Sequence, residues 1–137
     1  MTTTINPYVN FDGNTEQAVK FWAEALNAKL EIMRFGDSPM PSTPETKNRV
    51  MHATVKTDAL TLMASDTMPG QPAATGGNVS LSLNFTDKAE QTRVWDRLAV
   101  GGKVTMPLND EFFGRFGMLT DKFGVSWMLH FNTAPAK

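Results

Sequence analysis

The chain has 137 residues, of which 41% are hydrophobic, and a formal net charge of −1, the composition of an ordinary globular protein. The near-neutral charge argues against a basic surface for nucleic acid or an anionic membrane, and no apolar run approaches the ~18–20 residues of a membrane span. The lack of cysteine excludes disulfides, thiolate nucleophiles and thiolate metal sites. Because "MTTTINPYVN" has no basic segment followed by an apolar one, we expect a cytoplasmic protein.

The first half of the chain predicts a strand, a helix and three further strands. Residues 8–11 alternate, and Asn14 followed by Gln17 is a helix start signal. The helix that follows has an apolar face at three-to-four spacing, made of Ala18, Phe21, Trp22, Ala25 and Leu26. A second strand comes next, and alternating segments at 50–56 and 60–66 predict two more. Three prolines in the excursion 36–49 argue against regular structure there.

The second half of the chain predicts the same order of elements after a Gly- and Pro-rich link at 67–78. Residues 79–85 alternate, and Asp87 with Glu90 marks a helix start. A strand then leads toward Pro107, and residues 115–121 and 125–131 predict a final hairpin. Asp121 lies in its turn, where aspartate commonly hydrogen-bonds to its own backbone. The apolar helix face consists of Gln91, Val94, Trp95 and Leu98.

An internal repeat connects the two halves. Residues 10–32 and 84–106 align without gaps at a constant offset of 74 residues, with six identical positions, among them Asn10 with Asn84 and Phe11 with Phe85. We therefore predict an α+β fold in one domain, with βαβββ written twice. Module one is expected at 5–66, a linker at 67–78 and module two at 79–131.

Each predicted strand has an apolar side, expected to pack under a helix, and a second side of unusual composition. An ordinary solvated sheet face carries more Lys, Glu and Arg. A small, neutral, polar face suits the lining of a ligand groove, and the alternative is a solvated face that is short of charge. The second sides consist of Tyr8, Asn10, His52, Thr54, Lys56, Thr61, Met63, Ser65, Ser80, Ser82, Asn84, Ser126, Met128 and His130.

The twice-written unit resembles the vicinal-oxygen-chelate superfamily, which includes glyoxalase I, extradiol dioxygenases and bleomycin-binding proteins. The segments "NPYVNFDGN", "HATVKTDALTLMASD" and "RFGMLTDKFGVSWM" look like its PhnB-like branch. The resemblance implies two βαβββ modules that form an incomplete barrel around an internal cavity, commonly as a homodimer. Some members of the branch carry a demethylubiquinone methyltransferase label. Nothing in this chain resembles a glycine-rich methyl-donor loop, so we do not predict that activity.

The resemblance also implies where a metal would bind, on the inner faces of the first and last strands of each module. Those positions hold Tyr8, Asn10, Ser65, Ser80 and Met128. Met128 stands where the metal enzymes usually carry glutamate, and a thioether is a poor ligand for Mg²⁺, Mn²⁺, Ni²⁺ or Zn²⁺. We therefore predict no metal and no cofactor. The alternative is a metal-dependent glyoxalase-type lyase or transferase with ligands drawn from His52, Asp66 and His130.

Other side chains leave alternatives open. His52 is either a polar anchor or a general base. Arg115 either holds an anionic ligand in the groove or covers the edge of its strand. Phe112 and Phe113 cannot both point inward on one strand, so one is expected at a cavity mouth or dimer seam. Met40 is a candidate to close over that mouth.

The sequence thus predicts a protein that binds a small organic molecule in a metal-free cavity, with no nucleic-acid or membrane partner. A second possibility is the metal-dependent enzyme, and a third is a structural homodimer without a ligand. The expected ligand-binding residues are Tyr8, Asn10, His52, Ser65, Ser80, Arg115 and Met128.

Overall fold

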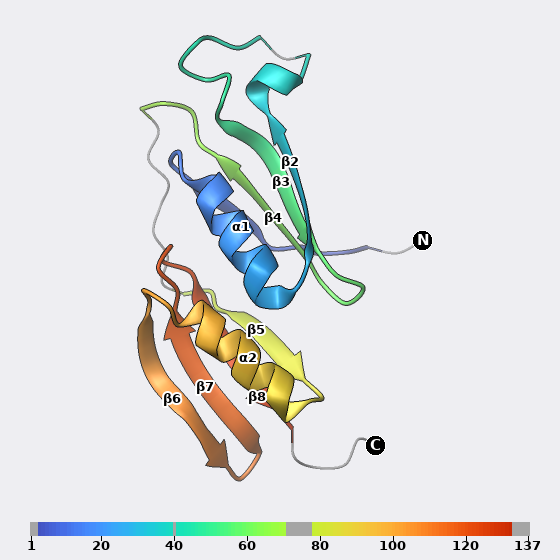
Figure 1. The fold of residues 1–137 in the computed structure, drawn as a ribbon, viewed down its shortest axis with the longest axis vertical. Helices are drawn as coiled ribbons and strands as arrows, with labels where there is room; N and C mark the ends of the chain where they lie inside the picture. The colour runs from blue at the N-terminus through green and yellow to red at the C-terminus, as the bar shows by residue number, and fades with distance from the viewer. Residues whose placement is uncertain (1–2, 40, 71–77, 133–137) are drawn as a thin grey trace. The chain divides into compact units, whose positions relative to one another are not determined.

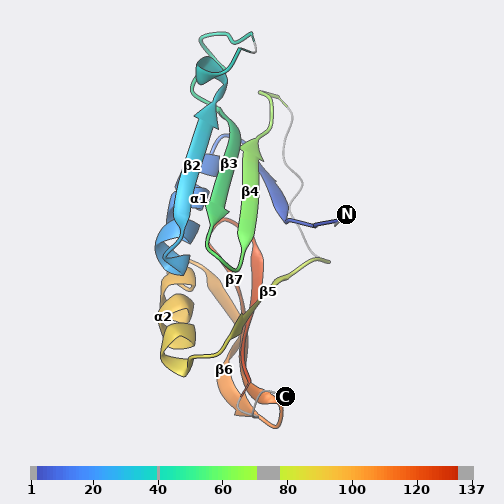
Figure 2. The same ribbon diagram turned by 90° about the vertical axis from the view of Figure 1, so that its right-hand side faces the viewer.

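The computed structural model describes residues 3–39, 41–70 and 78–132 and divides the chain into two compact units, residues 1–74 and 75–137. We call them unit one and unit two and describe each by itself. Both contain one long helix and a four-stranded sheet (Figures 1 and 2). Within the described residues, no helix is long and apolar enough to cross a membrane.

Unit one has a mixed sheet in the order β1-β4-β3-β2, with β1 parallel to β4 and the other pairs antiparallel. Helix α1 packs on one face of this sheet, mainly against β3 (Figure 2). Its elements are β1 (Tyr8–Phe11), α1 (Thr15–Leu26), β2 (Lys29–Arg34), the short 3-10 helix η1 (Phe35–Asp37), β3 (Val50–Lys56) and β4 (Thr61–Asp66).

Unit two repeats this topology, with the strand order β5-β8-β7-β6 and β5 parallel to β8. Helix α2 packs on β8 and β5. The predicted twofold βαβββ repeat is therefore confirmed, and each sheet is open rather than closed into a barrel. The elements are β5 (Leu81–Phe85), α2 (Lys88–Leu98), β6 (Lys103–Glu111), β7 (Gly114–Thr120) and β8 (Ser126–Phe131).

The predicted apolar faces form the cores. Trp22 is fully buried under unit one's sheet, and Trp127 and Leu129 are buried in unit two. One strand departs from strict alternation: the register between β2 and β3 shifts between Met33 and Arg34, which pairs Arg34 with Val50. Because of this irregularity Val50 is buried, whereas Met51, which strict alternation with Ala53 would bury, is half-buried.

The two helix starts are capped differently. In unit two Asp87 Oδ1 accepts the backbone N–H of Ala89 at 2.9 Å, as the sequence predicts. In unit one Asn14 is the N-cap residue of α1, as the sequence predicts, but its side chain makes no capping hydrogen bond. A carboxylate from β4, Asp66, accepts the N–H of Thr15 instead. A charged acceptor makes a stronger hydrogen bond than a neutral amide, so Asp66 serves this role well.

The connections after the helices differ between the units. In unit one the excursion 36–49 contains η1 and a series of turns, and backbone hydrogen bonds from Phe35 to Arg49 and from Gly36 to Lys47 close its base. Met40, the expected cavity cover, lies outside the described residues, as does most of the link 67–78. In unit two β6 continues past Pro107 and turns at Phe112 and Phe113 directly into β7. An outer strand tolerates proline, which is why Pro107 does not end β6.

Candidate ligand-binding site

Unit one has a sheet face opposite α1, which we call the polar face. Buried neighbours on each strand, such as Ala53, Leu62 and Ala64, point toward the helix, so the residues between them point the other way. The polar face is formed by Tyr8, Asn10, Lys29, Glu31, Met33, His52, Thr54, Lys56, Thr61, Met63 and Ser65. Its charged residues are Lys29, Glu31 and Lys56. Glu31 is the strand partner of Thr54, whereas the β2 partner of His52 is the neutral Met33.

His52 is the centre of a row of three polar side chains on this face. Its Nδ1 lies 3.2 Å from the Tyr8 hydroxyl, and its Nε2 lies 3.3 Å from the Thr54 hydroxyl. The Tyr8 and His52 rings are 5.7 Å apart, centroid to centroid, and tilted by 43°. Met63 pairs with both Tyr8 and Thr54 in the sheet register, so its side chain lies between them. Both ring nitrogens of His52 therefore have partners, and Tyr8, 47% exposed, remains open to a ligand.

Asn10 and Ser65 form a second polar pair on the same face. They are direct partners in the parallel register of β1 and β4, and the Ser65 hydroxyl donates to Asn10 Oδ1 at 3.2 Å. The structure thus brings the predicted residues Tyr8, Asn10, His52 and Ser65 onto one face of one sheet. The amide nitrogen of Asn10 is a donor on this face, and the Tyr8 hydroxyl can donate or accept.

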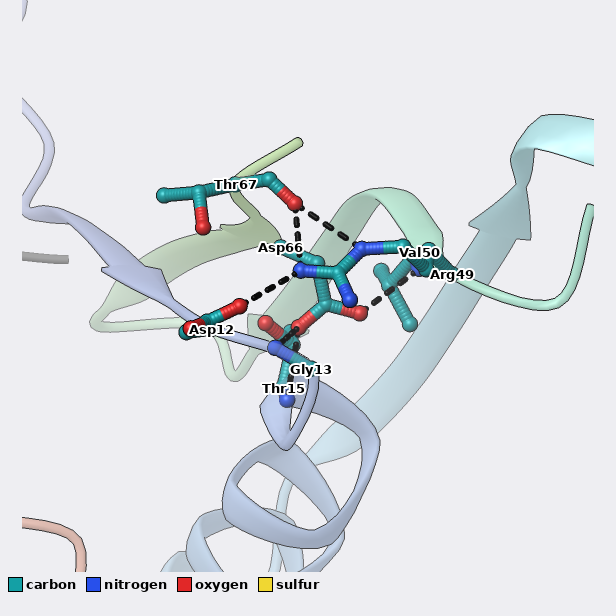
Figure 3. Close-up of polar contacts among 7 residues, drawn as sticks. All are labelled: Asp12, Gly13, Thr15, Arg49, Val50, Asp66 and Thr67. Carbon is teal, nitrogen blue, oxygen red and sulfur yellow. Dashed lines mark hydrogen bonds and ion pairs between the residues drawn. The ribbon is translucent and has the colours of Figure 1, made fainter. Parts of the chain in front are cut away.

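Asp66, a candidate metal ligand in the sequence, has a different role. Its Oδ1 accepts the N–H groups of Gly13 and Thr15 at 3.0 and 3.1 Å, and its Oδ2 accepts the N–H of Val50 at 2.9 Å (Figure 3). The side chain is 7% exposed and lies on the helix side of the sheet. Since Asp66 binds three backbone amides away from the polar face, it is not available there as a ligand. The prediction of Asp66 as a metal ligand is therefore not supported by the geometry.

Arg49 completes this cluster beside Asp66. Its Nε donates to the carbonyl of Thr67 and its Nη2 to Asp12 Oδ1, both at 2.9 Å (Figure 3). These contacts fasten the end of the excursion 36–49 to the segments that follow β1 and β4. Asp12 and Thr67 each lie two residues beyond the polar pair of Asn10 and Ser65, so Arg49 connects the chain just after that pair.

The corresponding face of unit two is more apolar. Met118 pairs with Met106 on one side and Met128 on the other, and Met128 pairs with Ser82. Ser80, a predicted ligand contact, precedes β5 and is exposed, so Ser82 rather than Ser80 is the serine beside Met128.

An aromatic cluster lies beside this methionine row. The ring centroid of Phe113 is 5.6 Å from that of Phe116 and 5.7 Å from that of His130. Phe112, which is 99% exposed, contacts Phe113 edge-on. Both phenylalanines are exposed in the turn between β6 and β7, and the expected place of one of them at a cavity mouth or dimer seam stays a prediction. His130 Nε2 is 3.2 Å from the Phe113 carbonyl, so this histidine is held by backbone at the end of β8.

Arg115 does not join Met128 on this face. Its strand partner is Phe131, on the same side as buried Leu129, and its Nη1 donates to the Thr92 hydroxyl of α2 at 2.8 Å. The sequence left two roles open for Arg115, a ligand contact in a groove or a cover for the edge of its strand. The structure shows a third, a hydrogen bond to α2 from an inner strand of the sheet.

Two residues of these faces were missed as site residues. Thr54 belongs to the row around His52, and Phe113 packs on His130. Thr54 had a sequence signal, since residues two apart on a strand share a face. Phe113 had none, because its direction depends on the turn after β6.

Within residues 3–39, 41–70 and 78–132, no three side chains of His, Asp or Glu lie together in a way that would hold a metal ion.

Comparison with known proteins places the chain in a family. The family model described as "3-demethylubiquinone-9 3-methyltransferase" matches residues 3–130. The chain belongs to this PhnB-like family. Among curated relatives of this PhnB-like chain, Protein YjdN of Escherichia coli is 32% identical and covers 92% of this chain and 93% of its own length.

Solved structures agree with this assignment. The protein PA1353 from Pseudomonas aeruginosa is 41% identical, with a TM-score of 0.86 over 96% of this chain and 98% of its own. A putative 3-demethylubiquinone-9 3-methyltransferase, the PhnB protein from Bacillus cereus, is 28% identical with a TM-score of 0.77 over 94% and 99%. A glyoxalase-related enzyme from Fulvimarina pelagi, 17% identical with a TM-score of 0.60 over 95% and 89%, shares the fold of this PhnB-like chain.

Proposed function

We propose that this PhnB-like protein binds a small organic molecule on the polar face of unit one, without a metal. The observation that supports this most is the row Tyr8–His52–Thr54, in which a histidine is bonded through both ring nitrogens. Polar groups fixed by such bonds, next to apolar Met33 and Met63, are the usual means of orienting a small ligand.

We assign the following contacts within this proposal. Tyr8 and His52 orient a polar group of the ligand, and Asn10 with Ser65 provides a second polar anchor. Ser80 and Met128, the contacts predicted in unit two, stay separate predictions and are not assigned to the polar face of unit one. We no longer include Arg115, because its guanidinium bonds to Thr92 on the helix side.

Thermal shift measurements against a metabolite library test the proposal. A molecule that binds only the folded state raises the melting temperature by mass action. We expect at least one compound class to raise the melting temperature of the wild type and not of His52→Gln or Tyr8→Phe. His130→Gln is the matched control, because it removes the other histidine of the chain, which is bonded to backbone. An equal response of wild type and His52→Gln to every compound would contradict the proposed site.

The metal-dependent alternative finds less support. Of its candidate ligands, Asp66 is engaged with the amides of Gly13, Thr15 and Val50. Metal analysis of protein purified without chelator distinguishes the two functions. Stoichiometric Ni, Mn, Fe or Zn that is lost on His52→Ala would overturn the metal-free proposal.

Among the described residues of unit one, the start of α1 offers no support for the methyltransferase activity in the family's description. Gly13 is the glycine between β1 and α1, and its positive φ of 91° suits the turn. Its N–H is bound to Asp66, so the start of α1 is already occupied by a carboxylate of the chain itself.

We also propose that the protein acts as a homodimer in the cytoplasm. The exposed Phe112 and the half-exposed Phe113 are apolar side chains of the kind that a second copy would cover. Analytical ultracentrifugation of the wild type and Phe112→Ser would test the dimer. A wild type that is monomeric at micromolar concentration would contradict the proposed dimer. It would also contradict a purely structural role, because that role requires a dimer.

A further inference from the structure

His52 differs from an ordinary bonded histidine in the chemistry of its two partners. A neutral imidazole carries one N–H donor and one acceptor nitrogen, and either nitrogen can hold the proton. Tyr8 and Thr54 face these nitrogens with hydroxyl groups, at 3.2 and 3.3 Å. Since a hydroxyl both donates and accepts, each tautomer of His52 satisfies both contacts.

The two tautomers expose opposite groups at Tyr8. In the first, the Tyr8 hydroxyl donates to Nδ1 and Nε2–H donates to Thr54, which leaves the Tyr8 oxygen to accept a hydrogen bond from a ligand. In the second, Nδ1–H donates to the Tyr8 oxygen and the Thr54 hydroxyl donates to Nε2. The Tyr8 proton is then free to donate to a ligand. Both hydrogen bonds of the row can therefore exchange donor and acceptor without the movement of a heavy atom.

We propose that this reversal makes the polar face accept either a hydrogen-bond acceptor, such as a carbonyl, or a donor, such as an N–H group, at the same position beside Tyr8. The inference rests on the proposed function and names its ligand class: small neutral molecules with one such polar group on an apolar body. Thr54 acts as a positioning residue, which contacts the ligand only through His52.

His130 provides an internal comparison. Its Nε2 faces the carbonyl oxygen of Phe113 at 3.2 Å, and a carbonyl oxygen only accepts. When His130 is neutral, this contact requires its proton on Nε2. His52 can change tautomer with its ligand, whereas His130 cannot, and these are the two histidines of the chain.

The test is ¹⁵N NMR of the two imidazoles in the full chain at about pH 8.5, where an ordinary histidine is neutral. The probes are acetophenone, whose oxygen only accepts, and indole, whose N–H donates, each added to saturation. His130→Gln assigns the signals. We expect acetophenone to shift the His52 signals toward the Nδ1–H tautomer and indole toward the Nε2–H tautomer, while His130 stays Nε2–H. Thr54→Val should weaken both responses, and Thr61→Val, which removes a hydroxyl of the same face outside the proposed contacts, should leave them unchanged.

Two results would overturn the inference in different ways. If both probes shift the backbone amide signals of Tyr8 and His52 but leave the tautomer of His52 the same, the row does not reverse, and the proposed binding site stands. If neither probe shifts any signal of the polar face, the proposed function itself is contradicted for this ligand class, and the inference is overturned with it.

Discussion

Trp127 Nε1 donates a hydrogen bond to Asp121 Oδ2 at 2.9 Å, and both side chains are almost completely buried. The other carboxylate oxygen, Oδ1, accepts the N–H groups of Phe123 and Val125 at 2.9 and 3.0 Å. Asp121 therefore organises the turn between β7 and β8 and ties it to the core of unit two, which confirms the turn role predicted from the sequence.

Replacement of Asp121 should destabilise unit two. In Asp121→Ala three N–H donors lose their acceptor. Because a buried donor without an acceptor costs up to about 1–3 kcal/mol, we expect a loss of several kcal/mol in the free energy of unfolding. Urea denaturation followed by tryptophan fluorescence measures it. Asp58→Ala, at an exposed position in the turn between β3 and β4, is the control and should change little. A loss of the same small size in both variants would contradict the role of Asp121.

Asp66 is expected to behave similarly in unit one. In Asp66→Asn an NH₂ group must face either the amides of Gly13 and Thr15 or the amide of Val50, so at least one buried donor meets another donor. We expect a loss of about 1–3 kcal/mol in unfolding free energy, measured by urea denaturation. Asp12→Asn is the matched control, since it weakens only the more exposed contact with Arg49, where about 0.2–1 kcal/mol is typical. Similar losses in the two variants would refute the assignment.

Gly117 allows α2 to lie close to the sheet of unit two. A Cβ at this position would come within 2.8 Å of the Trp95 ring and 3.0 Å of the Leu108 backbone nitrogen. We expect Gly117→Ala to cost about 1–3 kcal/mol of stability by overpacking, measured by thermal or urea unfolding. Trp95→Phe removes the ring atoms in contact, so the double variant should lose less than the sum of the single variants. Strict additivity would show that the clash is not with Trp95.

Glu16 gives a pH-dependent contribution to stability. Hydrogen bonds from Arg34 and Lys20, at 2.9 and 2.7 Å, lower the pKa of Glu16 from 4.5 to about 2. A carboxyl group whose pKa is lower in the folded state stabilises the fold above its unfolded pKa, and this stabilisation is lost as the pH falls from about 4.5 through about 2. Since the pair is partly exposed, Glu16→Gln should cost less than about 1 kcal/mol at neutral pH.

The difference between wild type and Glu16→Gln should therefore shrink steadily on acidification through this window. Unfolding free energies at a series of pH values measure it. A difference that is constant between neutral pH and about pH 2, or that grows on acidification, would contradict the assigned ion pairs.

Arg115 should matter for stability rather than for ligand binding. Arg115→Met keeps much of the apolar stem but loses the hydrogen bond to Thr92, so we expect a loss of about 0.5–1.5 kcal/mol in unfolding free energy. The ligand-induced rise in melting temperature should be the same as in the wild type. A selective loss of that rise, with stability unchanged, would restore Arg115 to the binding site.

The sequence predicted those features that depend on local periodicity. The strand faces and the buried Trp22 and Trp127 follow from alternation and helical spacing, and the matching topology of the two units follows from the repeat. The row around His52 was predicted in part. The sequence placed Tyr8, His52 and Thr54 on one face, but it did not predict the hydrogen bonds that join them.

The features that were missed depend on contacts between distant segments. Asp66 caps a helix that begins 51 residues earlier, at Thr15, and no local pattern records that contact. Arg115 falls on the helix side because of the register of β7 against β8, which alternation in its glycine-containing strand leaves open. The irregular pairing beside Val50 likewise depends on the partner strand β2.

Strand β6 has a consequence for how two copies of the chain can associate. It is an outer strand, Pro107 gives it one position without an N–H group, and its pairing with β7 is irregular around Met106. A foreign strand needs a straight, uninterrupted row of backbone donors and acceptors to extend a sheet. The edge at β6 is thus protected against strand addition, so copies that meet there would do so through side chains such as Phe112 and not through a continuous intermolecular sheet.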